Sequence, residues 1–455
     1  MNNAWFFQDL LATIADRGRT LLPASLFKGD TELGLQQLVE ALMSGRGEAS
    51  GVAIARQLLR HYEILEDDQQ RSAFFRYLTA RLETDETAAV AAATAYAGNP
   101  SLETLAELQT AIASPQQEFM RRLNLAPNGT AAIVRMRADL LRIGVDTPEL
   151  RQLDADMVHL LQSWFNRGFL VLRRIDWQTS AAILDRIIAY EAVHEIDGWE
   201  DLKRRLDPVD RRCFGFFHPS LVDEPLIFVE VALMHDMPAS IGDVLNEAPK
   251  SDADHQQPPA DPTTAVFYSI SNCQEGLRGI SFGNFLIKQV VADLMQDHAS
   301  LKTFVTLSPV PRFARWLACA QLPPEATAVR DQLAADPADA DPAAVAALAA
   351  RYFLTARTPT GAVIDPVARF HLGNGARLER INVAADPSAK AQSQSHGVMV
   401  NYLYEPREIE RNHEQFANQG TVAASKSVRA LLRDQHAADP TPALAAADAA
   451  AMERA

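Results

Sequence analysis

The stretch Ala265-Val-Phe-Tyr-Ser-Ile-Ser-Asn-Cys-Gln-Glu-Gly-Leu-Arg-Gly-Ile-Ser-Phe-Gly-Asn-Phe-Leu-Ile-Lys288 decides how this chain is expected to fold. Residues 265–271 predict a β-strand, and the last residues predict the first turns of an amphipathic helix. A helix N-terminus leaves about four backbone N–H groups unpaired and carries roughly half a unit of positive charge. Glycines let a phosphate approach those donors. The stretch therefore predicts a phosphate cradle, whose glycines are Gly276, Gly279 and Gly283.

The segments that follow extend this stretch into a βαβ unit. A helix is expected over about 282–298, and residues 303–307 predict a second strand. Two strands joined in this way are parallel, so their C-terminal ends lie at the same edge of the sheet, where open α/β sheets bind ligands. Ser308 follows the second strand and is expected beside the cradle. The alternative is that Ser308, which precedes a proline, is only a turn or cap residue.

The glycine pattern excludes two common nucleotide-binding loops. No Gly-Lys-Ser or Gly-Lys-Thr follows the glycines, and their spacing differs from a Rossmann fingerprint. The run Arg278-Gly-Ile-Ser-Phe-Gly283 matches more loosely the Arg/Gln-x-x-Gly-x-Gly pattern with which acetyltransferase folds wrap the pyrophosphate of acyl-CoA. Ser281 stands where that pattern has its first glycine. The basic patch that an anionic ligand needs is expected from Arg278, Lys288, Arg312 and Arg315.

His371 is a second candidate for chemistry. Asp365-Pro366 predicts a helix start, with Asp as N-cap and Pro at the first helical position, and the glycines at 373 and 375 predict its end. His371 is then near the end of a very short helix, where an imidazole can exchange a proton near neutral pH. The alternative is a structural histidine, since most lone histidines are. No His, Cys or Asp cluster has metal-ligand spacing, so no metal site is predicted.

Composition and charge exclude several classes of protein. Of 455 residues, 47% are hydrophobic and 22% charged, which is ordinary for a globular protein with two or three domains. No apolar run approaches the ~20 residues of a membrane helix. The net charge of −15 argues against broad binding to nucleic acid or anionic membranes. Three widely spaced cysteines indicate reduced thiols, so we expect a cytoplasmic protein.

The predicted secondary structure changes after Gly168. Before it, residues 1–168 predict a helical domain for packing or oligomerisation, without a titratable constellation. Residues 169–436 predict a second domain that contains a sheet, and residues 437–455 an alanine-rich tail that is poorly ordered or helical. The helical stripes are Leu35, Leu38, Val39 and Leu42; Ala55, Leu58, Leu59 and Tyr62; Phe74, Leu78 and Leu82; and Met157, Leu160, Leu161 and Trp164. Further strands are expected at 169–172, 214–217, 226–234, 377–383 and 398–404, helices at 181–191 and 343–356, and a loop at 246–262.

Several short motifs in a fixed order closely resemble the malonyl-CoA decarboxylase family. The similarity covers roughly residues 164–404, and the order of the motifs is far more specific than any one of them. They are Glu224-Pro-Leu226, Val231-Ala-Leu233, Phe267-Tyr-Ser-Ile-Ser-x-x-Gln-x-Gly-Leu-x-Gly279, Phe285-Leu-Ile-Lys288, Leu307-Ser-Pro-x-Pro311, Phe370-His-Leu-x-Asn-Gly-Ala376, Arg380-Ile-Asn382, Ala385-Asp386 and Asn401-Tyr402.

The resemblance implies an α+β protein: an all-α N-terminal domain that helps to build a tetramer, then an acetyltransferase-like (GNAT-like) α/β catalytic domain with a mixed sheet. It implies conversion of malonyl-CoA to acetyl-CoA and CO2 without a metal or organic cofactor. The family's catalytic serine, histidine and active-site tyrosine fall on Ser308, His371 and Tyr404. Ser281 departs from the family, whose other members carry a glutamate there. The CoA-phosphate loop falls on Arg278, Gly279, Ile280, Ser281, Phe282, Gly283 and Asn284.

The implied chemistry is an enolate reaction. Loss of CO2 leaves a thioester enolate, so the site must stabilise an oxyanion and then protonate carbon. The hypothesis is that His371, oriented by Ser308, donates this proton, while the CoA-phosphate loop holds the handle of the substrate. Two other functions remain open at this stage. One is an N-acyltransferase that uses acyl-CoA, and the other is a non-catalytic acyl-CoA sensor.

Overall fold

The computed structural model describes residues 3–20, 31–44, 47–245, 261–280, 286–320, 322–335 and 340–433. The chain divides into two compact units. The helical unit comprises residues 1–171, 216–226 and 272–283, and the sheet unit comprises residues 172–215, 227–271 and 284–455. The predicted tail at 437–455, and all of the predicted loop at 246–262 except its last two residues, lie outside the described residues.

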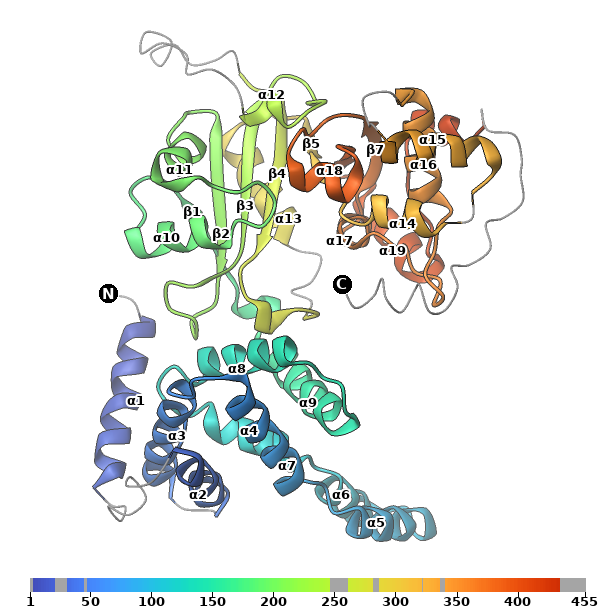
Figure 1. Cartoon of the computed structure of the whole chain (residues 1–455). Helices are drawn as coiled ribbons and strands as arrows, with labels where there is room; N and C mark the ends of the chain where they lie inside the picture. Colours follow the sequence, from blue (N-terminus) through green and yellow to red (C-terminus); the bar gives the residue numbers. More distant parts are fainter. Residues whose placement is uncertain are drawn as a thin grey trace. The chain divides into compact units, whose positions relative to one another are not determined.

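The helical unit is built on the predicted apolar stripes. All four stripes are buried except Trp164, which is half-buried, so their side chains form the core between the helices. Helix ends follow local capping chemistry: Asp67, for example, accepts the N–H of Gln70 at 2.8 Å at the start of α4. The helices, labelled in Figure 1, are α1 (Asn3–Arg19), α2 (Thr31–Met43), α3 (Glu48–Glu63), α4 (Asp68–Arg81), α5 (Glu86–Gly98), α6 (Leu102–Ala111), α7 (Pro115–Leu123), α8 (Gly129–Ile143) and α9 (Pro148–Trp164).

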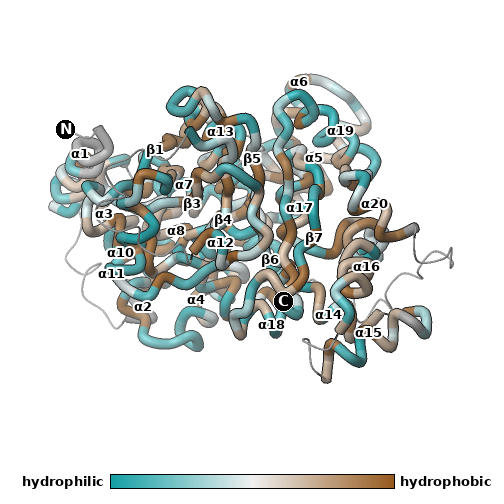
Figure 2. The backbone as a smooth tube through the Cα atoms, turned by 90° about the horizontal axis from the view of Figure 1, so that it is seen from above, coloured by the Kyte–Doolittle hydropathy of each residue, from teal (hydrophilic) through white to brown (hydrophobic). Residues whose placement is uncertain are grey.

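The strands form one mixed sheet in the order β1-β2-β3-β4-β5-β8-β6, with β7 paired to β8. β3 is an almost continuous apolar run, buried along its length except at Met234, and it is coloured as hydrophobic over most of that length in Figure 2. The strands are β1 (Val171–Ile175), β2 (Arg211–Phe217), β3 (Pro225–Met234), β4 (Thr264–Asn272), β5 (Thr303–Thr306), β6 (Ser308–Pro309), β7 (Arg377–Asn382) and β8 (Met399–Leu403).

The predicted βαβ unit is confirmed. β4 and β5 are parallel, with Thr264 opposite Thr303 and Phe267 opposite Thr306. The connection runs through α13, whose described residues begin at Leu286. β8 then pairs antiparallel with β5, β6 and β7, which makes the sheet mixed. The ends of β5 and β8 therefore meet beside β6, and this is where the polar side chains of the next section lie.

The remaining helices surround the sheet or extend from its far end (Figure 1). They are α10 (Ala181–Tyr190), α11 (Gly198–Leu206), α12 (Gly242–Leu245), α13 (Leu286–Asp297), α14 (Phe313–Cys319), α15 (Pro324–Ala335), α16 (Pro342–Leu354), α17 (Pro366–Gly373), α18 (Ala389–Ser395), α19 (Ile409–Gln419) and α20 (Lys426–Arg433). The predicted fold class, a helical region followed by a domain with a mixed sheet, is confirmed. The start of the first strand differs from the prediction: residues 167–169 form a short 3₁₀ turn after α9, and the strand begins at Val171 rather than at 169.

Candidate active site

Ser308 lies where the sheet changes strand partners. β5 ends at Thr306, and Ser308 opens the short strand β6, opposite Val400 of β8. Prolines at 309 and 311 follow, and Pro cannot donate to a ladder, so the pairing of β6 ends within two residues. Only 4% of Ser308 is exposed. The sequence thus places a buried hydroxyl at the carboxyl end of a strand, as expected.

His371 lies on α17, the short helix that the sequence predicts. Asp365 is its N-cap and accepts the N–H groups of Val367 at 2.9 Å and Ala368 at 3.0 Å, with Pro366 at the first helical position. His371 is in the last turn and is 3% exposed. α17 therefore presents an imidazole to the interior rather than to solvent.

The structure brings Ser308, His371 and Tyr404 together in one hydrogen-bonded chain. The Nε2 atom of His371 lies 3.2 Å from the Ser308 hydroxyl, and its Nδ1 atom lies 2.8 Å from the Tyr404 hydroxyl. Ser308 donates its only proton to the Thr306 hydroxyl at 2.8 Å, so it must accept from His371. Nε2 then carries the imidazole proton, and Nδ1 accepts from Tyr404.

Burial keeps this chain of hydrogen-bonded side chains electrically neutral. Burial lowers the pKa of His371 to about 3, because no charged partner offsets the loss of hydration of an imidazolium. Burial also raises the pKa of the Tyr404 phenol well above its ordinary value. The imidazole stacks on Tyr402, with ring centroids 4.6 Å apart and an angle of 23° between the rings. Near neutral pH the site therefore holds a neutral imidazole between two hydroxyls.

Two members of the site were not predicted. Thr306 accepts the Ser308 proton and also the N–H of Tyr402 at 3.1 Å, and Tyr402 supplies the face on which His371 stacks. Both lie two residues before a predicted site residue, Ser308 and Tyr404 respectively. Alternate residues of an extended segment share one face, so this spacing was the available signal.

The predicted CoA-phosphate loop is described only at its beginning. Arg278 and Gly279 are exposed, Ile280 is buried, and Ser281, Phe282, Gly283 and Asn284 lie outside the described residues. Gly279 has a φ of 80°, a conformation that favours glycine.

Gly276, the first of the predicted cradle glycines, has a packing role inside the helical unit. A Cβ there would lie 1.8 Å from the backbone oxygen of Val134 on α8. Arg137, also on α8, holds the turn by donating to the carbonyls of Gly276 and Arg278, each at 2.8 Å. The glycine at 276 is therefore explained by close approach to a helix.

The expected basic patch is only partly available to an anion. Lys288 on α13 forms an ion pair with Glu410 on α19. Arg278 lies 3.9 Å from Glu275, and both side chains are largely exposed. Arg312 is the N-cap of α14, and burial together with the nearby Arg369 lowers its pKa. In the described structure, Lys288 and Arg278 thus already face acidic partners.

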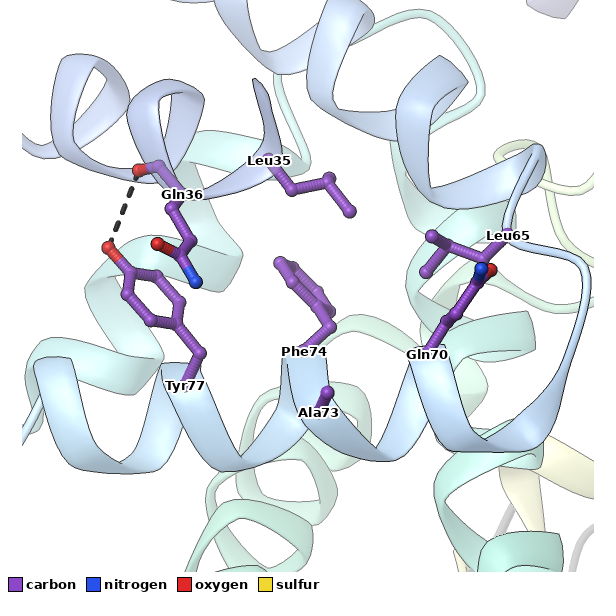
Figure 3. Close-up of a pocket in the computed structure, with 7 residues that line it drawn as sticks. All are labelled: Leu35, Gln36, Leu65, Gln70, Ala73, Phe74 and Tyr77. Atoms are coloured by element: carbon purple, nitrogen blue, oxygen red, sulfur yellow. Dashed lines mark hydrogen bonds between the residues drawn. The ribbon is translucent and has the colours of Figure 1, made fainter. Parts of the chain in front are cut away.

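The cavity drawn in Figure 3 lies within the helical unit and has a volume of about 50 Å³. This is room for one or two water molecules, far less than an acyl-CoA needs. Tyr77 donates to the backbone oxygen of Gln36 at 3.4 Å across its edge. We therefore assign no substrate to this cavity. Its lining residues are Leu35, Gln36, Leu65, Gln70, Ala73, Phe74 and Tyr77.

Among the described residues, no group of three or more His, Cys, Asp or Glu side chains is arranged to hold a metal ion. No described helix combines the length and the apolar character that crossing a membrane requires. Cys213 and Cys273 are buried, and Cys319 is exposed.

A mixed sheet that holds a buried chain of hydroxyl, imidazole and phenol groups is typical of enzymes that move a proton to or from a substrate. Comparisons with known proteins identify the family. The family model described as the malonyl-CoA decarboxylase C-terminal domain matches residues 168–441, and the one described as the N-terminal domain matches residues 82–165. The chain belongs to the malonyl-CoA decarboxylase family.

Individual relatives agree with this assignment. The mitochondrial malonyl-CoA decarboxylase of Rattus norvegicus is 32% identical over 361 residues, which cover 71% of this chain and 72% of the rat protein. The solved structure of malonyl-CoA decarboxylase from Rhodopseudomonas palustris is 50% identical, with a TM-score of 0.82 over 88% of this chain and 100% of that one. The structure from Agrobacterium vitis is 52% identical, with a TM-score of 0.80 over 88% and 99%. The predicted family, the enzyme class and the substrate malonyl-CoA are confirmed.

Proposed function

We propose that the chain decarboxylates malonyl-CoA with Ser308, His371 and Tyr404 as its catalytic residues. The observation that carries this proposal is the buried hydrogen-bonded chain through both nitrogens of His371, at 3.2 Å to Ser308 and 2.8 Å to Tyr404. A positioned acid typically contributes ~10²–10⁴-fold to a proton transfer. A buried imidazole held from both sides is positioned in this sense.

The bond between the malonyl α-carbon and its carboxylate breaks, CO2 leaves, and the electron pair passes into the thioester as an enolate. His371 then gives its Nε2 proton to the α-carbon, and acetyl-CoA forms. The thioester carbonyl is itself the electron sink, so the reaction needs no further cofactor in this proposal. Retention of activity after treatment with a chelator tests that part.

The flanking hydroxyls explain how a neutral histidine becomes an acid. A bound malonyl carboxylate places a negative charge near His371 and favours the imidazolium, which opposes the effect of burial on its pKa. The proton taken up with the substrate then resides on Nδ1, so the imidazolium that gives its Nε2 proton to carbon is left as a neutral imidazole. A hydroxyl can donate or accept, so Tyr404 can reverse its hydrogen bond when Nδ1 becomes protonated.

We further propose that Arg278, Gly279, Ile280, Ser281, Phe282, Gly283 and Asn284 hold the CoA phosphates, as the family resemblance implies. The positive φ of Gly279 supports a tight turn there. Remote binding energy from the CoA handle would position the malonyl group. Replacing Arg278 with Ala should raise KM more than it lowers kcat.

We also propose that the chain is a homo-oligomer, a tetramer by family resemblance, and that it works in the cytoplasm. Three widely spaced cysteines suit a reducing compartment. In the helical unit, α5 and α6 bury no residue, and they leave Val90 66% and Leu102 86% exposed. An apolar surface of this kind favours self-association. Sedimentation of Leu102→Glu should show smaller species than the unaltered protein if this surface forms the contact.

The decisive experiment incubates the purified protein with malonyl-CoA alone and measures CO2. Release without an amine excludes obligatory amine transfer and hence the N-acyltransferase alternative, whereas tight binding without turnover would favour an acyl-CoA sensor. Ser308→Ala and His371→Ala should each lower the rate by at least ~10-fold. Ser395→Ala is the matched control, because Ser395 is equally buried but bonds only to the backbone of Ala391 and Val398. Unchanged rates in both site variants would refute the assigned roles.

A further inference from the structure

A buried carboxylate joins the two segments that carry Ser308 and His371. Asp365 is 0% exposed, and its Oδ1 atom accepts the N–H groups of Val367 and Ala368 at the start of α17. Its Oδ2 atom accepts the hydroxyl of Tyr352, on α16, at 3.2 Å. Tyr352 in turn packs its ring against Phe313, with ring centroids 5.5 Å apart, and the backbone N–H of Arg312 contributes to lowering the pKa of Asp365. Arg312 ends the short proline-containing segment that begins at Ser308.

We propose that Asp365, held by Tyr352, is a positioning residue that sets the distance between Ser308 and His371. The inference rests on the proposed roles of Ser308 and His371. One carboxylate accepts hydrogen bonds from the helix that carries the histidine and from Tyr352, whose ring packs against Phe313, just after the segment that carries the serine. The two segments are far apart in sequence, and Asp365 links them through Tyr352.

The physical need for such a link follows from the size of the elements. α17 has only eight residues, and β6 has only two, so neither is held rigidly by its own hydrogen bonds. The bond from His371 to Ser308 is already long at 3.2 Å, and a small tilt of α17 would break it. A displacement of about 1 Å at reacting groups can cost ~10²-fold in rate. A fixed anchor between the two elements removes this freedom.

A side chain of ordinary capping type would be enough if helix formation were the only role. Asp341, which precedes Pro342 and caps α16 by accepting the N–H of Ala343, is exposed and makes that cap alone. Asp365 has the same Asp-Pro start but is buried, where an ionised carboxylate is costly unless several donors surround it. The additional donor, Tyr352 on α16, lies outside its own helix. The contrast points to a linking role for Asp365 beyond the cap.

The groups facing Asp365 give this role a signature in pH. Burial raises the pKa of Asp365 to about 6, and the hydrogen bonds from Ala368, Tyr352, Arg312 and Val367 oppose that rise. Tyr402 also faces the site of the carboxylate, since the negative charge of Asp365 raises the pKa of its phenol. Protonation below about pH 6 removes the charge that all four donors share. Activity should therefore fall as the pH drops through 6.

The test measures kcat and KM for decarboxylation between pH 5 and pH 8. Asp365→Asn keeps an oxygen for the cap but loses the acceptor for Tyr352 and the charge. We expect kcat to fall ~10–100-fold with little change in KM, and the decline below pH 6 to disappear. Tyr352→Phe keeps the carboxylate, and we expect the decline to move to higher pH, because that hydroxyl lowers the pKa of Asp365. Asp341→Asn, the matched cap control, should change neither.

The possible outcomes distinguish failure of this inference from failure of the proposed function on which it rests. If Ser308→Ala and His371→Ala lower the rate but Asp365→Asn retains both the rate and the acid decline, the link is refuted and the proposed function stands. If neither Ser308→Ala nor His371→Ala lowers the rate, the proposed function fails first. Circular dichroism shows whether Asp365→Asn is folded, and Tyr352→Phe decides the question if it is not. A decline unmoved in Tyr352→Phe would overturn the inference.

Discussion

The sheet unit contains two buried polar clusters that are built on opposite principles. The active-site chain consists of neutral groups: Ser308, His371 and Tyr404. The second cluster is ionic. Arg205, on α11, lies 3.4 Å from Glu230 on β3 and 3.0 Å from Asp201, and Glu230 is 0% exposed. Both clusters are buried, yet only the second contains a buried side chain that stays charged, the Arg205 guanidinium.

The two clusters also differ in how completely their polar atoms are paired, although the hydroxyl of Tyr402, on which His371 stacks, has no hydrogen-bond partner among the described residues. In the active-site chain, both nitrogens of His371 and the hydroxyls of Ser308 and Tyr404 have partners. Two further residues adjoin the ionic cluster: Arg205 donates to the carbonyl of His194 at 2.8 Å, and burial together with the charge of Glu230 raises the pKa of Tyr268. Four buried atoms of this group have no hydrogen-bond partner among the described residues. These are the Oε1 atom of Glu230, the Nε atom of Arg205, the Nε2 atom of His194 and the Tyr268 hydroxyl.

Burial has a different consequence in each of the two clusters. Burial disfavours every charge, so it lowers the pKa of His371 to about 3 and raises the pKa of Glu230 to about 8. A chain of neutral hydroxyls around His371 can reverse its donors and acceptors when a substrate brings charge. Arg205 cannot lose its proton and cannot accept one, so its cluster has a fixed polarity. We therefore expect the first cluster to control activity and the second to control stability.

We expect the largest effect on kcat when both Ser308 and His371 are replaced. If Ser308 and His371 act as a unit, the double variant Ser308→Ala/His371→Ala should be no slower than the slower single variant, each reduced by ~10²–10⁴-fold in kcat. Independent residues would instead multiply their losses. Steady-state CO2 release measures this, and thermal unfolding of all three variants shows whether stability is unaffected. Multiplicative losses would separate the two side chains.

The ionic cluster should respond in the opposite way. Arg205→Met leaves the Glu230 carboxyl buried without its cation, and we expect a loss of about 3–5 kcal/mol in the free energy of unfolding. The kcat of the protein that remains folded should be nearly unchanged. Arg204→Met is the control, since that neighbouring side chain is 74% exposed. Chemical denaturation measures the loss, and a larger effect on kcat than on stability would reverse the comparison.

Much of the fold around the active site was predictable from local signals. An almost continuous apolar run predicted β3, and the strand–helix–strand spacing predicted the parallel pair of β4 and β5. The Asp365-Pro366 cap predicted α17 and placed His371 near its end. These features depend on neighbours in sequence, so the residues themselves carried the information.

The contacts between distant segments were not predictable. The spacing of Ser308 and His371 gives no sign that a carboxylate links their segments through Tyr352. Gly276 was interpreted as part of a phosphate cradle, whereas its lack of a side chain is explained by the backbone of α8. α5 and α6 have no clear apolar stripe and bury no residue, so periodicity did not indicate them. Each case depends on tertiary packing, which overrides local preference.

A smaller effect concerns the pH dependence of stability. Glu titrates near 4.3 in an unfolded chain, whereas burial raises the pKa of Glu230 to about 8 in the folded protein. Between these values the folded state binds more protons than the unfolded state, so stability falls as the pH rises from about 5 to 8. We expect a loss of about 2 kcal/mol, less than the full shift implies, because nearby Arg205 and structural relaxation moderate it.

Replacing the carboxyl group tests this assignment. Glu230→Gln cannot ionise, so its denaturation free energies at pH 5, 6.5 and 8 should lie on a flatter profile than those of the unaltered protein. Glu200→Gln, an exposed position on α11, should leave the slope as it is. An equal slope in Glu230→Gln would show that another group causes the dependence.

The smallest effect compares one substitution in both clusters. Tyr404→Phe removes the hydroxyl that faces the Nδ1 atom of His371, and a net hydrogen bond of about 0.5–1.5 kcal/mol corresponds to a ~2–10-fold loss in kcat. Tyr268→Phe removes a hydroxyl that has no partner among the described residues, and kcat should not change. Its stability should stay the same or rise slightly, because a buried polar atom without a partner is lost. If the two variants had equal kcat, Tyr404 would have no part in the proton chain, and His371 would depend on Ser308 alone.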